Sequence, residues 1–150
     1  MLLIRLREWG GIHSALVTVE AKLVEALEPL PAVRLAVLFG SHARGRASRH
    51  SDIDLAVLLA PDTPQNRKAT RRATLALAQT IDIVFTADAP PLLRMEIARH
   101  GKVLIERQPF AWANFKAKAM IDWGDWGPHA RRMWKAAIQR LREEMGRGST

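Results

Sequence analysis

Two polar segments interrupt the apolar runs in the first half of the chain, and they constrain the fold more than any other feature. One apolar run ends at Gly40 and Ser41, and a later one opens with Asp52 and Asp54. Because side chains on a strand alternate between its faces, Asp52 and Asp54 are predicted to point the same way. The apolar residues between and after them are then predicted to point into a core.

This arrangement predicts a phosphate chemistry. Two carboxylates on one strand face repel each other unless a cation lies between them. Oxygen-only ligands suit Mg²⁺, which also binds substrate phosphates. The turn at Gly40 and Ser41 can present backbone N–H groups and a hydroxyl to those phosphates. We therefore predict phosphoryl or nucleotidyl transfer.

Strands and helices are predicted to alternate, which indicates an α/β domain. Strands are predicted at residues 34–39, 52–59, 81–85 and 103–105, and helices at 12–28, 41–45, 65–79 and 90–100. Residues 109–145 are predicted to be helical but broken in two at Gly124, Gly127 and Pro128, because glycine and proline disfavour helix interiors. We expect a single domain over residues 1–150, with a core of about 12–105 and a helical extension of about 109–145.

Composition narrows the choice of partners. The chain has no cysteine, which excludes disulfides and thiolate metal sites and agrees with a cytoplasmic location. No apolar run is long enough to span a bilayer. The formal net charge of +8 suits an anionic nucleotide, a nucleic acid or an acidic protein. The basic residues are spread over several predicted elements, which disfavours direct binding of nucleic acid.

The motifs resemble those of a known family. Gly40-Ser41-x-Ala43-Arg44-Gly45 followed by Ser51-Asp52-x-Asp54-Leu55 is similar to the motif of the DNA polymerase β-like nucleotidyltransferases, above all their smallest members, the minimal nucleotidyltransferases (MNT proteins). That family has a third carboxylate on a later strand, and Asp82 occupies such a position. The resemblance implies an α/β (α+β) fold, in which a small mixed sheet is flanked by helices and followed by a C-terminal helical extension.

The resemblance also implies roles for individual residues. Asp52, Asp54 and Asp82 would be catalytic and would bind two Mg²⁺ ions. Gly40 and Ser41 would hold the phosphates of ATP. Arg44 would either neutralise phosphate charge or form a structural salt bridge.

The family resemblance further implies a protein partner. MNT proteins are commonly antitoxins paired with a HEPN ribonuclease toxin, and they can transfer AMP from ATP to a tyrosine of that toxin. This chain contains no tyrosine, which agrees with modification of another molecule in a hetero-oligomer. Two alternatives remain open: an antitoxin that acts by contact alone, and a nucleotidyltransferase acting on a small molecule or RNA.

Tryptophan is concentrated in the last quarter of the chain. These residues are predicted to cover the sheet or to form a partner surface, since Trp and Arg are favoured at interfaces. The segment 123–127 is expected to be the more exposed part, with Trp123 and Trp126 as anchors. The tryptophans concerned are Trp112, Trp123, Trp126 and Trp134.

Overall fold

The computed structural model describes residues 18–47, 51–77 and 79–147. Its elements follow the predicted order, except that α3 ends at Leu75 and not at residue 79. The predicted helix at residues 12–28 is described from Val19 onward, and its earlier part lies outside the described residues. The elements are α1 (Val19–Leu27), β1 (Val33–Phe39), α2 (Gly40–Ala43), β2 (Ile53–Leu59), α3 (Pro64–Leu75), β3 (Ile81–Phe85), η1 (Thr86–Asp88), α4 (Pro91–His100), β4 (Lys102–Glu106) and α5 (Ala111–Arg147).

The four strands form one mixed sheet in the order β3-β2-β1-β4. Strand β1 is antiparallel to β2 and to β4, whereas β2 and β3 are parallel. The sheet confirms the predicted fold class. Its register places Asp54 of β2 opposite Asp82 of β3, and Phe39 at the end of β1 opposite Asp54.

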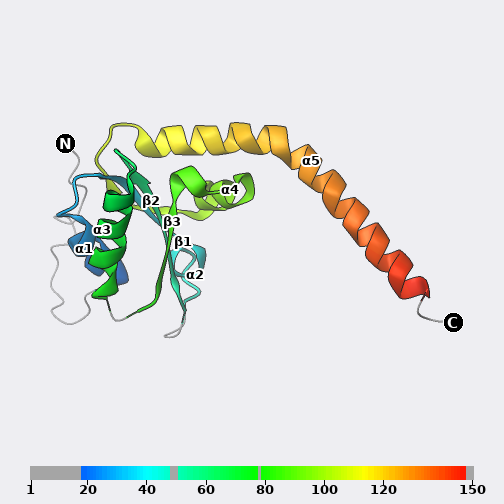
Figure 1. The fold of residues 1–150 in the computed structure, drawn as a ribbon, viewed down its shortest axis with the longest axis horizontal. Coiled ribbons are helices and arrows are strands. Elements are labelled where there is room, and N and C mark those ends of the chain that lie inside the picture. Colours follow the sequence, from blue (N-terminus) through cyan, green and yellow to red (C-terminus); the bar gives the residue numbers. More distant parts are fainter. Residues whose placement is uncertain (1–17, 48–50, 78, 148–150) are drawn as a thin grey trace.

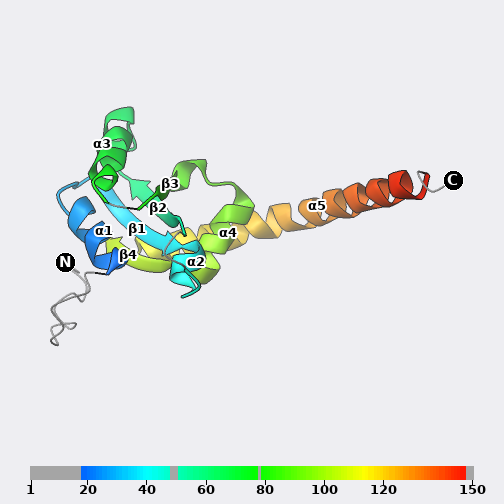
Figure 2. The ribbon, with the colours of Figure 1, turned by 90° about the horizontal axis from the view of Figure 1, so that it is seen from below.

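Helices cover both faces of the sheet (Figures 1 and 2). Alternate residues of β2, beginning at Ile53, join the core that includes Leu23 and Leu27 of α1. The intervening residues face α4 and α5, where Ala56 packs in the same cluster as Ile97. Because strand side chains alternate, Asp54 belongs to this second face.

Helix starts follow from local capping chemistry. The Thr18 hydroxyl accepts a hydrogen bond from the N–H of Ala21, and the Thr63 hydroxyl accepts one from the N–H of Asn66. These bonds satisfy donors that the first turn of a helix leaves free. Pro64 follows Thr63 at a position where its missing N–H costs little.

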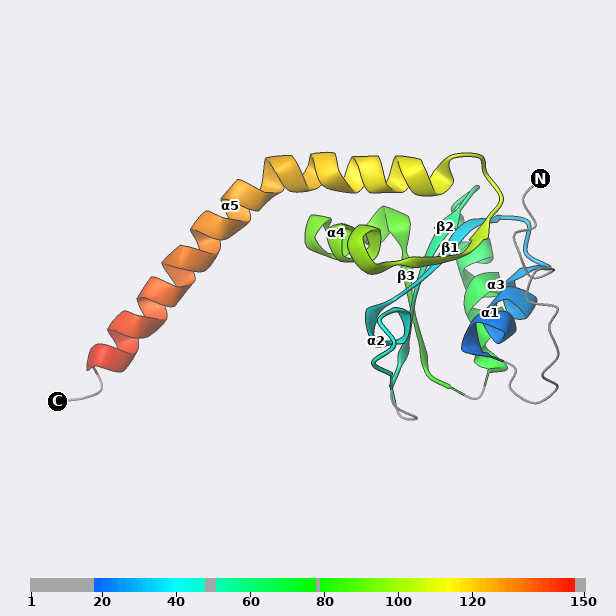
Figure 3. The same ribbon diagram turned by 180° about the vertical axis from the view of Figure 1, so that it is seen from behind.

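The C-terminal segment differs from the prediction. Gly124, Gly127 and Pro128 lie inside one continuous helix, α5, so the predicted break is wrong. Figures 1 and 3 show α5 changing direction near its middle, and we attribute the bend to Pro128. A bend removes the clash of the proline ring with the preceding turn and keeps the remaining helical hydrogen bonds.

The two halves of α5 have different surroundings. The first half packs on the domain: Trp112 stacks on Phe115 with ring centroids 5.8 Å apart, and Asp122 pairs with Arg94 of α4 at 2.9 Å. From Pro128 onward the described residues are exposed, apart from the partly exposed Ala130 and Ile138. Within the described part of the chain, no helix has the length and apolar character needed to cross a membrane.

Candidate active site

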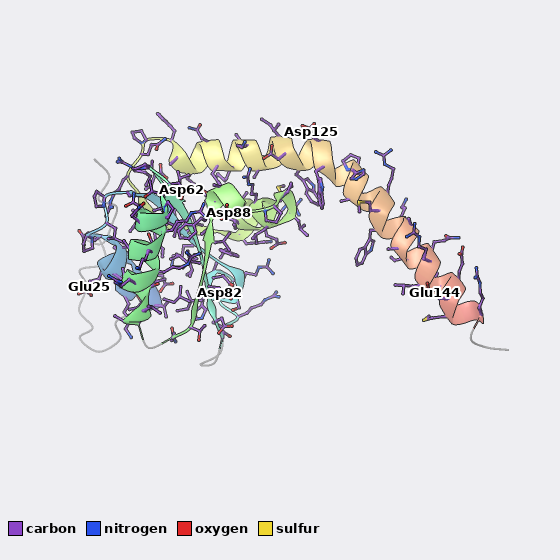
Figure 4. The ribbon with its side chains drawn as sticks, viewed as in Figure 1. Glu25, Asp62, Asp82, Asp88, Asp125 and Glu144 are labelled. Atoms are coloured by element: carbon purple, nitrogen blue, oxygen red, sulfur yellow. The ribbon has the colours of Figure 1, made fainter. Side chains whose placement is uncertain are left out.

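Three carboxylates gather where β2 and β3 begin. Asp54 and Asp82 are register partners on adjacent parallel strands, so their side chains lie side by side on one face of the sheet. Asp52 lies two residues before Asp54, just outside β2, and is exposed. Figure 4 shows Asp82 beside α2, at the opposite end of β3 from Asp88. The structure thus brings the three predicted aspartates to one end of the sheet.

The environment of Asp54 opposes its ionisation. Partial burial is the main cause that raises the pKa of this carboxyl above 3.8, and the charges of Asp82 and Asp52 raise it further. The nearby His42 lowers the pKa by a smaller amount. Asp54 therefore carries a negative charge that two neighbouring carboxylates repel, which is the situation that a bound cation relieves.

The donor set fits Mg²⁺. All three candidate ligands are carboxylates, and Mg²⁺ is commonly held by one or two carboxylates together with substrate phosphates, without a complete protein cage. Among the described residues, no three His, Asp or Glu side chains are already arranged so that together they could hold a metal ion. Metal binding by Asp52, Asp54 and Asp82 therefore stays a prediction.

The Gly40-Ser41 turn lies directly against Asp54. Gly40 has a φ of +69°, and a Cβ at this position would overlap the Asp54 Oδ2 atom and lie 3.0 Å from Asp54 Cγ. Only glycine combines this backbone conformation with so close an approach. The turn and the carboxylate are therefore parts of one site, and Ser41 is partly exposed beside them.

Two polar contacts connect α2 to its surroundings. The Nε2 atom of His42 lies 3.2 Å from the carbonyl oxygen of Ser51, which leads into β2. Arg44, at the end of α2, forms an ion pair with Glu96 of α4. Both side chains of this pair are more than a third exposed, so it adds little to stability. Glu96 is thus the partner in the salt bridge that was one of the two expected roles of Arg44. The other expected role, phosphate binding, stays a prediction.

Sequence reasoning missed the contributions of His42 and Glu96. His42 directly follows Gly40-Ser41, at the variable position of the motif. Its place inside the motif could have indicated that it lies near the carboxylates. Glu96 gave no signal, because it lies 52 residues from Arg44 and sits on a different helix.

Comparison with known proteins identifies the family. The polymerase beta nucleotidyltransferase family matches residues 21–110, which include all the residues of the candidate site. The chain belongs to this nucleotidyltransferase family. The match confirms the resemblance in the motifs and covers the sheet through β4.

Individual relatives of this nucleotidyltransferase are toxin–antitoxin proteins. The protein adenylyltransferase MntA of Shewanella oneidensis is 35% identical over 89 residues, which are 57% of this chain and 63% of the relative, so the match spans less than two thirds of the relative's length. A crystal structure of a toxin–antitoxin with AMP-PNP matches with a TM-score of 0.63 and 27% identity, over 83% of this chain and 99% of that one. The complex of tri-AMPylated S. oneidensis HEPN toxin with MNT antitoxin matches with a TM-score of 0.57 and 25% identity, over 82% and 95% of the two chains.

The repulsion at Asp54 predicts an unusual stability effect. A carboxyl whose pKa is raised in the folded state makes folding less favourable as the pH rises above 3.8, because the unfolded chain ionises first. In the absence of metal, we expect the Asp54→Asn variant to have a higher melting temperature than the wild-type protein at pH 7. Added Mg²⁺ should raise the melting temperature of wild type and leave that of Asp54→Asn unchanged.

Asp62→Asn is the matched control for this measurement. Its hydrogen bond with Arg67 lowers the pKa of the Asp62 carboxyl, so its ionised form stabilises the fold. Asp62→Asn should therefore lower the melting temperature at pH 7 and leave the response to Mg²⁺ intact. A destabilised Asp54→Asn that still responds to Mg²⁺ would contradict the assignment of Asp54 as a metal ligand.

Proposed function

We propose that this protein is an Mg²⁺-dependent nucleotidyltransferase that transfers AMP from ATP to a tyrosine of a HEPN ribonuclease toxin, and thereby acts as its antitoxin. The observation that carries the proposal is the pairing of Asp54 with Asp82 beside the Gly40 turn, in a chain of the nucleotidyltransferase family. The relatives named as an adenylyltransferase and as partners of an AMPylated toxin support the choice of AMP and of the acceptor.

In this proposal each site residue has a defined task. Asp52, Asp54 and Asp82 hold the metal, and Gly40 and Ser41 hold the β- and γ-phosphates. The chemistry supplied by two bound Mg²⁺ ions is stabilisation of phosphate charge and a lowered pKa of the acceptor hydroxyl. The relative with AMP-PNP bound supports ATP as the nucleotide.

The transfer itself exchanges one bond to phosphorus for another. The tyrosine oxygen forms a bond to the α-phosphorus, and the bond from that phosphorus to the bridging oxygen of the leaving pyrophosphate breaks. We propose that Asp82 accepts the hydroxyl proton; its exposure supports this role, because an acceptor from another molecule can reach it. Arg44 can offset charge on the phosphates if it leaves Glu96 when ATP binds.

The acceptor must be provided by another molecule. The given sequence has no tyrosine, and among the described residues the element that follows β4 is the helix α5. We propose a single domain over residues 1–150, with a core of about 12–105 and an extension of about 109–145, that takes its acceptor from a protein partner in a cytoplasmic hetero-oligomer. The absence of cysteine supports this location.

A variant of Asp82 separates transfer from contact. Asp82→Asn should still capture the toxin in a pull-down but should fail to rescue cells from its toxicity, because the proton acceptor and a metal ligand are lost. Asp88→Asn is the matched control, since Asp88 follows the same strand and pairs with Arg67 at the other end of β3 (Figure 4). Full rescue by Asp82→Asn at the expression level of wild type would favour an antitoxin that acts by contact alone.

A further inference from the structure

An apolar hollow lies at the base of the free half of α5. Its volume is about 450 Å³, and its walls come from the middle of α5 and from Leu92 of α4. Trp123 and Trp126 stand side by side in it, with ring centroids 5.6 Å apart and planes tilted by 48°. Gly127 is buried and lies against the ring of Trp123, which is one turn earlier in the same helix.

The hollow continues into an apolar stripe along the free half of α5. The spacing of three or four residues places these side chains on one helix face. Trp134 is 70% exposed and Met145 is 73% exposed, although both are large and apolar. We call the stripe the docking arm, and it consists of Trp126, Ala130, Met133, Trp134, Ala137, Leu141 and Met145.

The docking arm lacks the packing that normally stabilises a protein helix. Most helices derive their stability from burying an apolar face, and described residues of this chain do not cover the arm. Large exposed apolar patches on a protein generally mark an interaction site. The exposed apolar face of the arm therefore has the character of an interaction surface.

Charge indicates the chemistry of that partner. Between Pro128 and Arg147 the helix carries six basic and two acidic residues, an excess of four positive charges. A second copy of this chain would bring two such helices together, and their like charges would repel. A nucleic acid would match the charge but would leave the apolar stripe without a counterpart. An acidic protein surface with its own apolar ridge matches both features.

The position of the docking arm relates it to the active site. Figures 1 and 3 show the arm leaving the domain on the side where α2 and α4 lie. These two helices are joined by the Arg44–Glu96 ion pair next to the Gly40 turn. A partner seated on the arm is thus held on the side of the domain that carries the carboxylates.

We infer that the docking arm and its hollow bind an acidic, helical surface of the toxin and hold it beside the active site. This inference rests on the proposed function, which supplies the identity of the partner. It separates the protein into a surface that captures the acceptor and a site that modifies it. Loss of the arm should then raise the toxin concentration needed for transfer without changing the rate at saturation.

Trp134→Ala tests the apolar contact. We expect it to weaken toxin binding, measured by calorimetry without ATP, about tenfold or more, the size typical of a lost interface anchor. The rate of AMP transfer at saturating toxin should stay as in wild type. Ile121→Ala is the matched control, since Ile121 is 65% exposed on the same helix but lies outside the stripe. Alanine favours helix, so circular dichroism should show both variants folded.

Arg140→Glu tests the charge. It should weaken toxin binding and reduce its dependence on salt, whereas Arg72→Glu on the exposed face of α3 should change neither. Wild-type affinity in both Trp134→Ala and Arg140→Glu would overturn the inference. An equal loss in Ile121→Ala would also overturn it, because the binding surface would then lie elsewhere on the helix.

The remaining outcomes separate the inference from the proposed function. The docking inference is overturned if the wild-type protein does not bind the toxin. It is also overturned if sedimentation shows a dimer of this protein that the Trp134→Ala variant no longer forms, or if the protein forms a complex with RNA that Arg140→Glu abolishes. Binding that depends on Trp134 and Arg140 but gives no AMP transfer supports the docking arm and overturns the proposed function alone.

Discussion

Asp54→Asn is expected to reduce AMP transfer about a thousandfold or more, since metal stabilisation of the reacting phosphate contributes several kcal/mol and each 1.36 kcal/mol is a tenfold change in rate. Asp54 is at the centre of the carboxylate group: it pairs with Asp82 in the sheet register, contacts the Gly40 turn and has a pKa raised by burial and by both neighbouring aspartates. An amide in its place removes the charge while keeping nearly the same shape.

The rate is best measured in a single turnover with ATP labelled at the α-phosphate. Asp88→Asn should transfer AMP at the wild-type rate, because Asp88 lies at the other end of β3 from the site. The double variant Asp52→Asn/Asp54→Asn provides the strictest form of the test. Wild-type transfer by that variant would show that the metal, or the reaction, is located elsewhere.

Gly40→Val is expected to lower ATP affinity and turnover about a hundredfold or more in kcat/KM, a loss of roughly 2.7 kcal/mol. Two effects combine. A residue with a Cβ is strained by roughly 1–2 kcal/mol at the φ of +69° that Gly40 adopts. The new side chain would also overlap the Asp54 carboxylate and displace it from Asp82.

Gly45→Val separates these two effects. Gly45 has almost the same φ, +68°, but among the described residues, its chain neighbours apart, no atom lies within 4 Å of the position that its Cβ would take. It should therefore share the backbone strain and keep most of the ATP affinity. Ser41→Ala should also have a smaller effect than Gly40→Val, because the backbone donors remain. Unchanged ATP affinity and turnover in Gly40→Val would indicate that the triphosphate binds elsewhere.

Local patterns in the sequence were sufficient to predict where the strands lie and which of their side chains are buried. Ile53 and Leu55 are buried as their alternation with Asp52 and Asp54 predicts. The neighbourhood of Asp54 and Asp82 could not be derived in this way, since it depends on β2 and β3 being parallel neighbours. The family resemblance supplied that connection, because it links the order of the motifs to a known sheet.

The C-terminal helix shows where local rules fail. A proline in a helix interior lowers helix stability by about 3 kcal/mol. Together with the two nearby glycines, Pro128 therefore led to the prediction that the helix is broken. The helix bends and continues, and Gly127 packs against Trp123. The ion pair between Arg44 and Glu96 could not be predicted from the sequence either, because it depends on how α2 and α4 are positioned on the folded sheet.

The most direct test of the proposed function is the intact mass of the toxin. A HEPN ribonuclease toxin, the acceptor in the proposed function, should be incubated with ATP, Mg²⁺ and this protein, and then mapped by peptide mass spectrometry. The proposed function predicts a mass increase of one or more adenylyl groups, located on tyrosine, absent without Mg²⁺ and absent with Asp82→Asn. A toxin that is neutralised while its mass stays unchanged would contradict it.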